Sequence, residues 1–461
     1  MSATGAGRRG CCCRRGDGVG LGGTLNADTI FAVASGSGRA AVAIMRVSGA
    51  GCAGIVERLC GAALVPRCAC VRTLRGAGGE LLDRALVLWF PRPRSFTGED
   101  CVEFHIHGGA AVRDGVAGAL VALSARPAEA GEFSRRAFLN GKMDLLAAEA
   151  AADLVEAETS AQRVQALRQM GGALGDQYRG WSARLLRLLA QQEALIDFPD
   201  EDLPIGVDDA VNGEIAALAG EMKRHLQDGG RGERLREGLV FAIVGPPNVG
   251  KSSLMNAISE RKVAIVAKTA GTTRDVLEAR IVLGGVPVTL LDTAGLRDTD
   301  DPIEAEGVRL ARERAGMADL VINVADASLP DGGALVVGID VSPGVERLQI
   351  YNKIDQASPG IIAFLAISAL TGQGMAALRD HLADIARRLT SRSGPPPLTR
   401  ARHRAAVGEA LACVTAAANA PLAELRGEDL RLAMRSLGRL TGEVGVEDIL
   451  DSVFGQFCIG K

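Results

Sequence analysis

The segment 245–252, GPPNVGKS, has the residue types and the spacing of a phosphate-binding loop. A buried-strand pattern at 239–244 precedes this loop, and a helix-compatible pattern at 253–258 follows it. Glycines allow successive backbone N–H groups to curl around a phosphate, and the N-terminus of the helix adds partial positive charge. We therefore expect Lys251 to reach the β- and γ-phosphates of a nucleotide and the Ser252 hydroxyl to hold Mg²⁺.

Two further segments supply groups that act on the γ-phosphate and its metal ion. The sequence at 271–273 is GTT, and a hydroxyl here can close on Mg²⁺ and the γ-phosphate. The strand pattern at 286–291 ends in Asp292, which can anchor Mg²⁺ through water, and the N–H of Gly295 can face the γ-phosphate. Alone, the phosphate loop is a moderately specific motif, but these segments follow it in the order that a nucleotide site requires.

The next two segments predict which base the nucleotide carries. A strand pattern leads into NKID at 352–355, where the Asp355 carboxylate can accept hydrogen bonds from both N1–H and the 2-amino group of guanine. Adenine has neither donor, so this residue selects GTP over ATP. After a further strand pattern, Ser368 and Ala369 form a backbone cap for the guanine O6. These segments lie at the carboxyl ends of predicted strands, where α/β sheets bind ligands, so the sequence predicts GTP binding.

The residue that follows Gly295 limits the mechanism of hydrolysis. It is Leu296, whereas many small GTPases have a glutamine at this point to orient the attacking water. Leucine cannot orient water, so hydrolysis needs another water-positioning group and another source of positive charge. The charged segment that follows is either a solvated loop or the source of that group. Its charged residues are Arg297, Asp298, Asp300, Asp301, Glu304 and Glu306.

The elements that must position these residues form the middle of a multidomain α/β chain. Alternating strand and helix patterns at 238–388 predict a nucleotide-binding domain with a mostly parallel sheet and helices on both faces. Helical patterns at 143–237 and 389–461 predict a helical domain that this α/β domain interrupts. Patterns at 27–142 predict an α+β domain, and we interpret the Gly- and Arg-rich segment 1–26 as a disordered extension or a start codon assigned too early.

Composition limits the partners and the compartment. The 461 residues carry 52 basic and 55 acidic side chains, a net charge of −3, so no overall basic field attracts nucleic acid or an anionic membrane. Aromatic residues make up 3%, which argues against a surface that stacks many unpaired bases. The sequence contains no apolar run that predicts a membrane span, and its ten cysteines form no CxxC pair, so we expect reduced thiols in the cytoplasm.

Four segments, together with the nucleotide motifs, resemble the MnmE family of tRNA-modifying GTPases, also called TrmE. They are FTGED at 96–100, AGEFSRRAFLN at 130–140, DFPD at 197–200 and CIGK at 458–461, and the resemblance covers about 28–461. It implies a Ras-like P-loop GTPase domain, a helical domain and an N-terminal α+β folate-binding domain through which the chain forms a homodimer.

The resemblance also implies a reaction and a partner. With an FAD-dependent protein of the MnmG (GidA) family, in a heterotetramer or a larger assembly, the enzyme would act on the wobble uridine, U34, of certain tRNAs. It would place a carboxymethylaminomethyl or aminomethyl group on C5 of that uridine. A tetrahydrofolate derivative of the 5,10-methylene or 5-formyl type would supply the one-carbon unit.

In the nucleotide site, the resemblance implies a K⁺ ion that stimulates hydrolysis when two GTPase domains dimerise. Such an ion would neutralise charge between the β- and γ-phosphates as an arginine finger does. Its ligands would be Asn248, Ala267, Thr269 and Thr272, and those of Mg²⁺ would be Ser252 and Thr273. Ala267 lacks a hydroxyl and Lys268 adds a cation, whose side chain we expect to point to solvent. The implied GTP-binding residues are Asn248, Val249, Gly250, Lys251, Ser252, Ser253, Ala267, Lys268, Thr269, Ala270, Gly271, Thr272, Thr273, Asp292, Thr293, Ala294, Gly295, Asn352, Lys353, Asp355, Ser368 and Ala369.

Four residues match the folate contacts of the family: Arg46, Glu103, Lys142 and Lys461. A glutamate can pair with the N–H and amino groups of a pterin, and cations can meet the carboxylates of a folate. From their positions alone, Arg46 would be a salt-bridge partner at a strand end and Lys142 a surface charge.

The resemblance assigns catalysis to three residues. Lys251 would act on the phosphates, and Glu304 would orient the attacking water through a bridging water. Cys458 is the candidate nucleophile or proton donor for the uridine ring, the alternative being an inert cysteine. His105 and His107 have the spacing of metal ligands on one strand face, but no third ligand is visible, so we expect them to serve packing.

Two other interpretations share the GTPase motifs. A ribosome-assembly GTPase has the same core, but such proteins append an RNA-binding module and a basic face, and neither is evident after residue 397. A folate-dependent transferase fused to an unrelated switch is the other interpretation. Saturable folate binding by residues 27–145 would favour the tRNA-modifying enzyme or the transferase over the ribosome-assembly GTPase.

Overall fold

The computed structural model describes two compact units. The residues described are 28–36, 38–197, 207–259, 278–292, 316–329, 344–356, 365–390, 396–444, 447–455 and 457–460. Unit 1 contains the described residues up to 140 together with 458–460, and unit 2 contains those from 141 to 457. The C-terminal residues thus belong to unit 1, whereas the sequence analysis placed them with the second helical segment. The predicted helical and nucleotide-binding domains together form unit 2.

Unit 1 is built around a six-stranded sheet in the order β3-β4-β5-β2-β1-β6. Neighbouring strands are antiparallel, except that β6 pairs with β1 in parallel. Alternate side chains such as Phe104 and Ile106 on β5 enter a core that helices α1 and α2 cover with Ile55 and Leu120. The elements are β1 Thr29–Val33, β2 Val42–Ser48, α1 Cys52–Cys60, β3 Cys70–Arg75, β4 Leu81–Phe90, β5 Cys101–His107, α2 Ala110–Ala122, β6 Ala125–Pro127 and α3 Glu132–Leu139.

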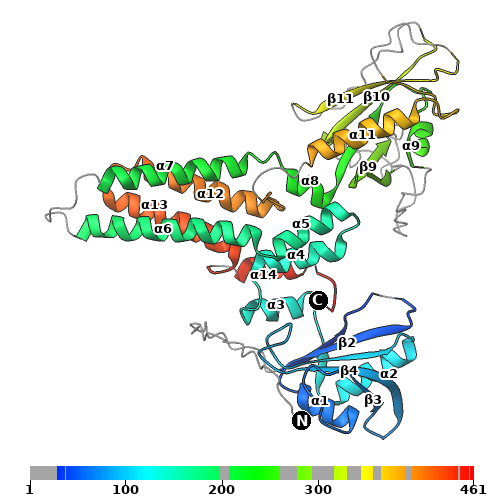
Figure 1. Ribbon diagram of the computed structural model, residues 1–461, viewed down its shortest axis with the longest axis vertical. Helices are drawn as coiled ribbons and strands as arrows, with labels where there is room; N and C mark the ends of the chain where they lie inside the picture. Colours follow the sequence, from blue (N-terminus) through cyan, green and yellow to red (C-terminus); the bar gives the residue numbers. More distant parts are fainter. Residues whose placement is uncertain are drawn as a thin grey trace, which may run out of the picture. The chain divides into compact units, whose positions relative to one another are not determined.

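Unit 2 contains a bundle in which helices from the two helical segments lie side by side (Figure 1). Leu185 and Leu188 on α6 pack in one core with Leu437 and Leu440 on α13, so the helical segments before and after the inserted domain share a core. The helices are α4 Leu145–Glu156, α5 Ser160–Met170, α6 Ala173–Asp197, α7 Val207–Leu226, α8 Arg231–Glu237, α12 Ala401–Ala418, α13 Ala423–Thr441 and α14 Glu447–Phe454.

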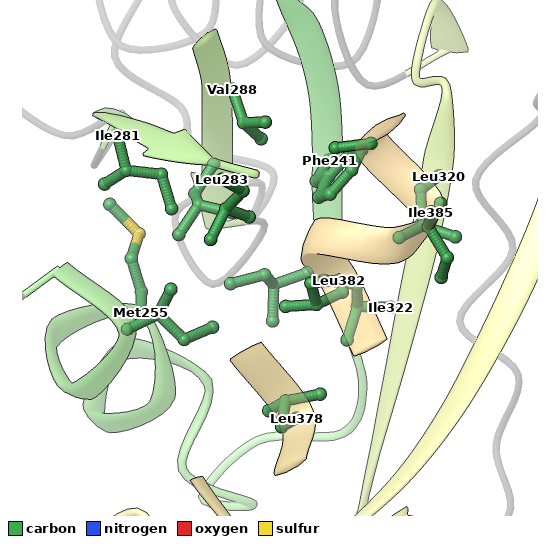
Figure 2. Packing of buried hydrophobic residues seen from close by; sticks show 14 of the residues in the cluster. Phe241, Met255, Ile281, Leu283, Val288, Leu320, Ile322, Leu378, Leu382 and Ile385 are labelled. Atoms are coloured by element: carbon green, nitrogen blue, oxygen red, sulfur yellow. The ribbon is translucent and has the colours of Figure 1, made fainter. Parts of the chain in front are cut away.

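The remainder of unit 2, residues 238–390, is the inserted α/β domain. Its sheet has the order β12-β11-β10-β7-β9-β8, and only the edge strand β8 runs antiparallel to its neighbour. Figure 2 shows its core, where Phe241 of β7 and Ile322 of β10 face Leu382 of α11. The elements are β7 Leu239–Val244, α9 Lys251–Ser259, β8 Glu278–Leu283, β9 Val286–Asp292, β10 Leu320–Asp326, β11 Glu346–Asn352, β12 Leu365–Ala366 and α11 Met375–Leu389.

Two arginines hold both connections of the inserted domain to helix α4. Arg236 lies in the last turn of α8, just before β7, and its Nε lies 2.8 Å from Oδ1 of Asp153. Arg400 lies just before α12, and its Nη2 donates to the same oxygen at 2.7 Å. One carboxylate oxygen therefore joins the points where the chain leaves the helical domain and returns to it.

A buried ionic cluster lies beside this junction. The Glu149 carboxylate of α4 accepts hydrogen bonds from Nε and Nη2 of Arg402, both at 2.6 Å, and lies 2.8 Å from Nε2 of His403. Glu149 is 1% exposed and His403 is fully buried. Burial alone would raise the pKa of Glu149, but His403 and Arg402 lower it well below its usual range. The cluster therefore holds a charged carboxylate inside unit 2.

Among the described residues, no helix is both long enough and apolar enough to cross a membrane.

Candidate nucleotide-binding site

The phosphate loop lies between β7 and α9, at the carboxyl end of the central strands. Two of its glycines have positive φ, Gly245 at 154° and Gly250 at 94°. A Cβ atom on Gly250 would lie 2.4 Å from Nδ2 of Asn352, and one on Gly245 would lie 2.3 Å from the carbonyl oxygen of Val324. Only glycine fits at these positions, because the loop passes so close to strands β10 and β11.

Lys251 and Ser252 begin α9 and face inward. The Lys251 ammonium donates hydrogen bonds to the carbonyl oxygens of Gly245 and Pro246, at 2.9 and 2.8 Å, and the residue is 7% exposed. The Ser252 hydroxyl donates to Oδ2 of Asp292 at 2.5 Å. The structure thus brings together a cation, a hydroxyl and a carboxylate that the sequence analysis took from three separate positions. The Ser252 hydroxyl and the Asp292 carboxylate thus lie together, as expected for residues that hold Mg²⁺ directly and through water.

Asn352 links the phosphate loop to the segment predicted to cap the base. Its Nδ2 donates to the carbonyl oxygen of Val249 at 2.8 Å, and its Oδ1 accepts from the N–H of Ala369 at 3.0 Å. Asn352 is buried, whereas Asp355, at the end of the same motif, is exposed and free to meet a ligand edge. Asn352 therefore positions the two loops, and Asp355 is available to select the base.

The sequence analysis did not identify a carboxylate at this edge, Asp326. It ends β10, and its Oδ2 accepts a hydrogen bond from the Lys353 ammonium at 2.6 Å. Burial acts to raise its pKa, but Lys353 and Ser328 outweigh burial and lower it. A signal was present, because Asp326 ends an apolar strand pattern just as Asp292 does.

Part of the predicted site lies outside the described residues. The predicted nucleotide, metal and catalytic residues in this position are Ala267, Lys268, Thr269, Ala270, Gly271, Thr272, Thr273, Thr293, Ala294, Gly295 and Glu304, and the predicted folate residue is Lys461. Among the described residues, no group of three or more His, Cys, Asp or Glu side chains could hold a metal ion.

The structure brings two of the predicted folate residues together in unit 1. The Nε of Arg46 on β2 donates to Oε1 of Glu103 on β5 at 3.0 Å, and both side chains are about one-fifth exposed. The Arg46 guanidinium lies 5.0 Å from the ring centre of Phe96. Nε2 of His105 is enclosed, lies 3.6 Å from Oε2 of Glu103 and has no hydrogen-bond partner within the described part of the chain. Lys142, in contrast, is exposed and belongs to unit 2.

The segments 96–100 and 130–140 meet in a polar network of unit 1. Glu99 accepts hydrogen bonds from the Ser48 hydroxyl at 2.7 Å and from Nη1 of Arg136 at 3.2 Å. Arg136 is 5% exposed and its Nη2 also contacts Glu132 at 2.9 Å. Arg126 joins the network and helps lower the pKa of Glu132 against the effect of burial. These contacts give each charged side chain of the network a partner of opposite charge. The motif matches alone did not indicate that the two segments meet.

Cys458 is exposed and lies in the C-terminal segment of unit 1. This segment adds a bridge between Ile459 and Ala130, and a Cβ on Gly460 would lie 2.3 Å from the carbonyl oxygen of Val33. His107 is not isolated either, since its Nδ1 lies 2.7 Å from Oδ1 of Asp83. The His107 side chain is 70% exposed, so it makes a contact between strands β4 and β5 at the surface and is not packed in the core.

The chain resembles known proteins over most of its length. Residues 29–142 match the family model "GTP-binding protein TrmE N-terminus", and residues 145–458 match "MnmE helical domain". The tRNA modification GTPase MnmE of Gluconacetobacter diazotrophicus is 58% identical over 438 residues, which cover 94% of this chain and 98% of that protein. The protein of the same name from Granulibacter bethesdensis is 53% identical over 445 residues, covering 95% of this chain and all of that protein. The crystal structure of the G domain of the T. maritima FeoB iron transporter is 28% identical, with a TM-score of 0.24, over 32% of this chain and 98% of that chain.

Proposed function

Because the chain belongs to the MnmE (TrmE) family of tRNA modification GTPases, we propose that its GTP is bound and hydrolysed at the edge of the inserted domain that carries Lys251, Ser252, Asp292 and Asn352. A GTP-hydrolysing, tRNA-modifying enzyme needs a phosphate site, a metal site and a base site in one cleft. The single observation that carries the proposal is that Asn352 contacts both the phosphate loop and the base-capping segment.

The residues present fit Mg²⁺. The Ser252 hydroxyl and the Asp292 carboxylate contact each other at 2.5 Å, and hard oxygen donors of this kind suit Mg²⁺. When bound, the ion would neutralise negative charge on the phosphates. Lys251 would exchange its bonds to the carbonyls of Gly245 and Pro246 for bonds to phosphate, and Asp355 would accept from the guanine edge.

A K⁺ ion is the second cation of this proposal. Asn248 lies in the phosphate loop with an exposed side chain, so its neutral oxygen is available to a cation. The remaining expected ligands, Ala267, Thr269 and Thr272, and the water-orienting Glu304 lie outside the described residues. Leu296 stands where many small GTPases have a glutamine that orients the attacking water. Another group must therefore orient the water, which supports a role for these groups when two GTPase domains meet.

A folate is proposed to bind in unit 1 near Arg46 and Glu103. The fit rests on three features: a carboxylate, a guanidinium beside the partly exposed ring of Phe96, and the enclosed Nε2 of His105 without a partner among the described residues. Such a set offers an acceptor, a cation and a flat surface to a pterin. Lys142, in unit 2, and Lys461, outside the described residues, stay predictions as cations for the carboxylates of the folate.

The tRNA step is proposed to take place in a homodimer that joins an FAD-dependent partner of the MnmG family. The one-carbon unit of the folate would go to C5 of the wobble uridine. Cys458 is exposed in the segment docked on unit 1, so it is accessible to a substrate there.

Mass analysis of the wobble uridine tests the whole proposal. A strain lacking this chain should accumulate tRNA without the C5 substituent, and the wild-type chain should restore it. Lys251→Ala should fail to restore it, because the phosphate site loses its cation, whereas the control Lys223→Ala, an exposed residue of α7, should restore it fully. Unchanged uridine in the deletion strain would contradict the proposed reaction.

Hydrolysis rates in different salts test the cation. Turnover of GTP by the full-length chain should be faster in KCl than in NaCl at equal ionic strength, since Na⁺ is too small to span the same oxygens. Equal rates would remove K⁺ from the proposal and leave the assignment of the GTP site in place.

A further inference from the structure

Asp326 and Asn352 are neighbours on the nucleotide edge of the inserted domain. Strands β10 and β11 run parallel, and their register pairs Asp326 with Asn352 at the carboxyl end of both strands. The N–H of Ala327 donates to the carbonyl oxygen of Asn352 at 2.8 Å, which continues the pairing past the strand ends. The residue after Asn352 is Lys353, so Asp326 lies beside the guanine motif although it is not part of it.

Both carboxylate oxygens of Asp326 have fixed partners. Oδ1 accepts from the N–H and the hydroxyl of Ser328, at 2.9 and 2.6 Å, and Oδ2 accepts from the Lys353 ammonium at 2.6 Å. The residue is 7% exposed. Because both oxygens of Asp326 accept hydrogen bonds, the position of the carboxylate is fixed. The Lys353 ammonium must therefore adopt one position to pair with it.

Lys353 is held in a backbone conformation that few non-glycine residues adopt. Its φ is +67°, in the left-handed region. The next residue, Ile354, donates its N–H to the carbonyl oxygen of Ile367 at 3.2 Å, which ties the turn to the base-capping segment. About one quarter of the side chain is exposed, so its stem is accessible from the site while its ammonium is bound.

We propose that Asp326 is a positioning residue for nucleotide binding, which fixes the Lys353 ammonium so that the stem of Lys353 forms a wall of the site beside Asp355. A free lysine stem samples many rotamers, and ordering it costs conformational entropy. The ion pair with Asp326 orders the lysine stem before the nucleotide binds, so nucleotide binding does not have to offset this cost. Methylene groups can pack on the face of any purine, so Asp326 should affect affinity without affecting the choice of base.

Nucleotide affinity of Asp326→Asn tests the proposal, measured by calorimetry on the full-length chain with Mg²⁺. Asparagine keeps the shape and an acceptor for Ser328 but removes the charge that holds Lys353. Affinities for GDP and for IDP, which lacks the 2-amino group, should both fall about tenfold and by the same factor. The KM for GTP should rise likewise, while kcat at saturation stays within about twofold.

Glu346→Gln is the matched control. Glu346 begins the same strand β11 and pairs with Arg388 at the same distance of 2.6 Å, but this pair lies at the opposite end of the sheet. Its loss should leave both affinities within about twofold of wild type. An equal loss in this variant would show a general effect of charge on the domain, and would overturn the positioning role.

A double-mutant cycle with Lys353→Met separates positioning from a structural role. Methionine keeps most of the stem and removes the ammonium, so Asp326→Asn should have no further effect on affinity in this background. A tenfold loss there as well would show that Asp326 acts independently of Lys353. Unchanged GDP affinity in the single variant, or an increase, would also overturn the proposal, since an increase would mean that the pair holds Lys353 away from the ligand.

Discussion

Two polar clusters of unit 2 differ in the partners that satisfy them. Around Glu149, the buried carboxylate contacts Arg400, Arg402 and the buried His403. Around Lys251, the ammonium instead contacts carbonyl oxygens of its own loop, and Ser252 contacts Asp292 at the rim of the sheet. The partners of Glu149 cannot be replaced without unfolding. The carbonyl partners of Lys251 can be replaced by phosphate, and the contact between Ser252 and Asp292 can be replaced by contacts to a metal ion. Buried charge therefore serves stability in one region and ligand exchange in the other.

Removing the Glu149 carboxylate should produce the largest effect. Glu149→Ala leaves the fully buried His403 and the partly buried Arg402 without their shared partner, and we expect a loss of about 3 to 5 kcal/mol in the free energy of unfolding of unit 2. The chain has two tryptophans, and Trp181 lies buried in the helical bundle. Urea unfolding followed by fluorescence in a Trp89→Phe background therefore reports on this unit.

Glu193→Ala supplies the matched control for Glu149→Ala. Its pair with Arg431, at 2.7 Å, joins α6 to α13, but both side chains are about half exposed. The expected loss is below about 1 kcal/mol. If the two variants lost the same free energy, burial would not be what distinguishes the Glu149 cluster.

The next effect in size is a dependence of stability on pH. Burial lowers the pKa of His225 from 6.5 to about 4, with smaller contributions from Arg404 and His403 and an opposing one from Asp228. Between these values the unfolded chain binds a proton that the folded chain does not, so stability falls as the pH falls from 6.5 to 4. We expect His225→Gln to remove about 2 kcal/mol of the loss between pH 7 and pH 5. Urea midpoints at both pH values check this, with His381→Gln on the exposed face of α11 as the control.

The smallest effect on stability should come from the nucleotide site. Lys251→Ala removes two hydrogen bonds to carbonyls, but it also removes a cation from a nearly buried position. We expect the free energy of unfolding without nucleotide to change by less than about 1 kcal/mol, while GTP binding is lost. A loss as large as that of Glu149→Ala would make the loop a structural cluster and end the contrast between the two regions.

Much of the fold followed from local patterns. Strand and helix patterns predicted β7, α9 and β9 to within two residues, and the helical patterns before and after the inserted domain predicted a helical domain that it interrupts. The phosphate loop, Asp292 and Asn352 were identified because each motif is short and carries its own chemistry. Local sequence is sufficient for such elements, since their residues act within a few positions of one another.

The ionic clusters could not be predicted in the same way. Glu149 and His403 lie far apart in the sequence, on opposite sides of the inserted domain, and no local pattern pairs them. Asp326 has a strand-end signal, but its partner Lys353 depends on the register of β10 and β11. The Arg136 network likewise requires the sheet order of unit 1, which sequence patterns left open.

The single oxygen of Asp153 that accepts both Arg236 and Arg400 has a mechanical consequence. A rotation of the inserted domain would pull on both arginines, and therefore on one oxygen of helix α4, at the same time. While both ion pairs with Asp153 hold, the connections that carry Arg236 and Arg400 stay side by side. Small rotations of the inserted domain would therefore move helix α4 with them. A larger rotation of the inserted domain would first have to break one of the two ion pairs with Asp153. Helix α4 therefore carries the contact that separates small, coupled rotations from larger, uncoupled ones.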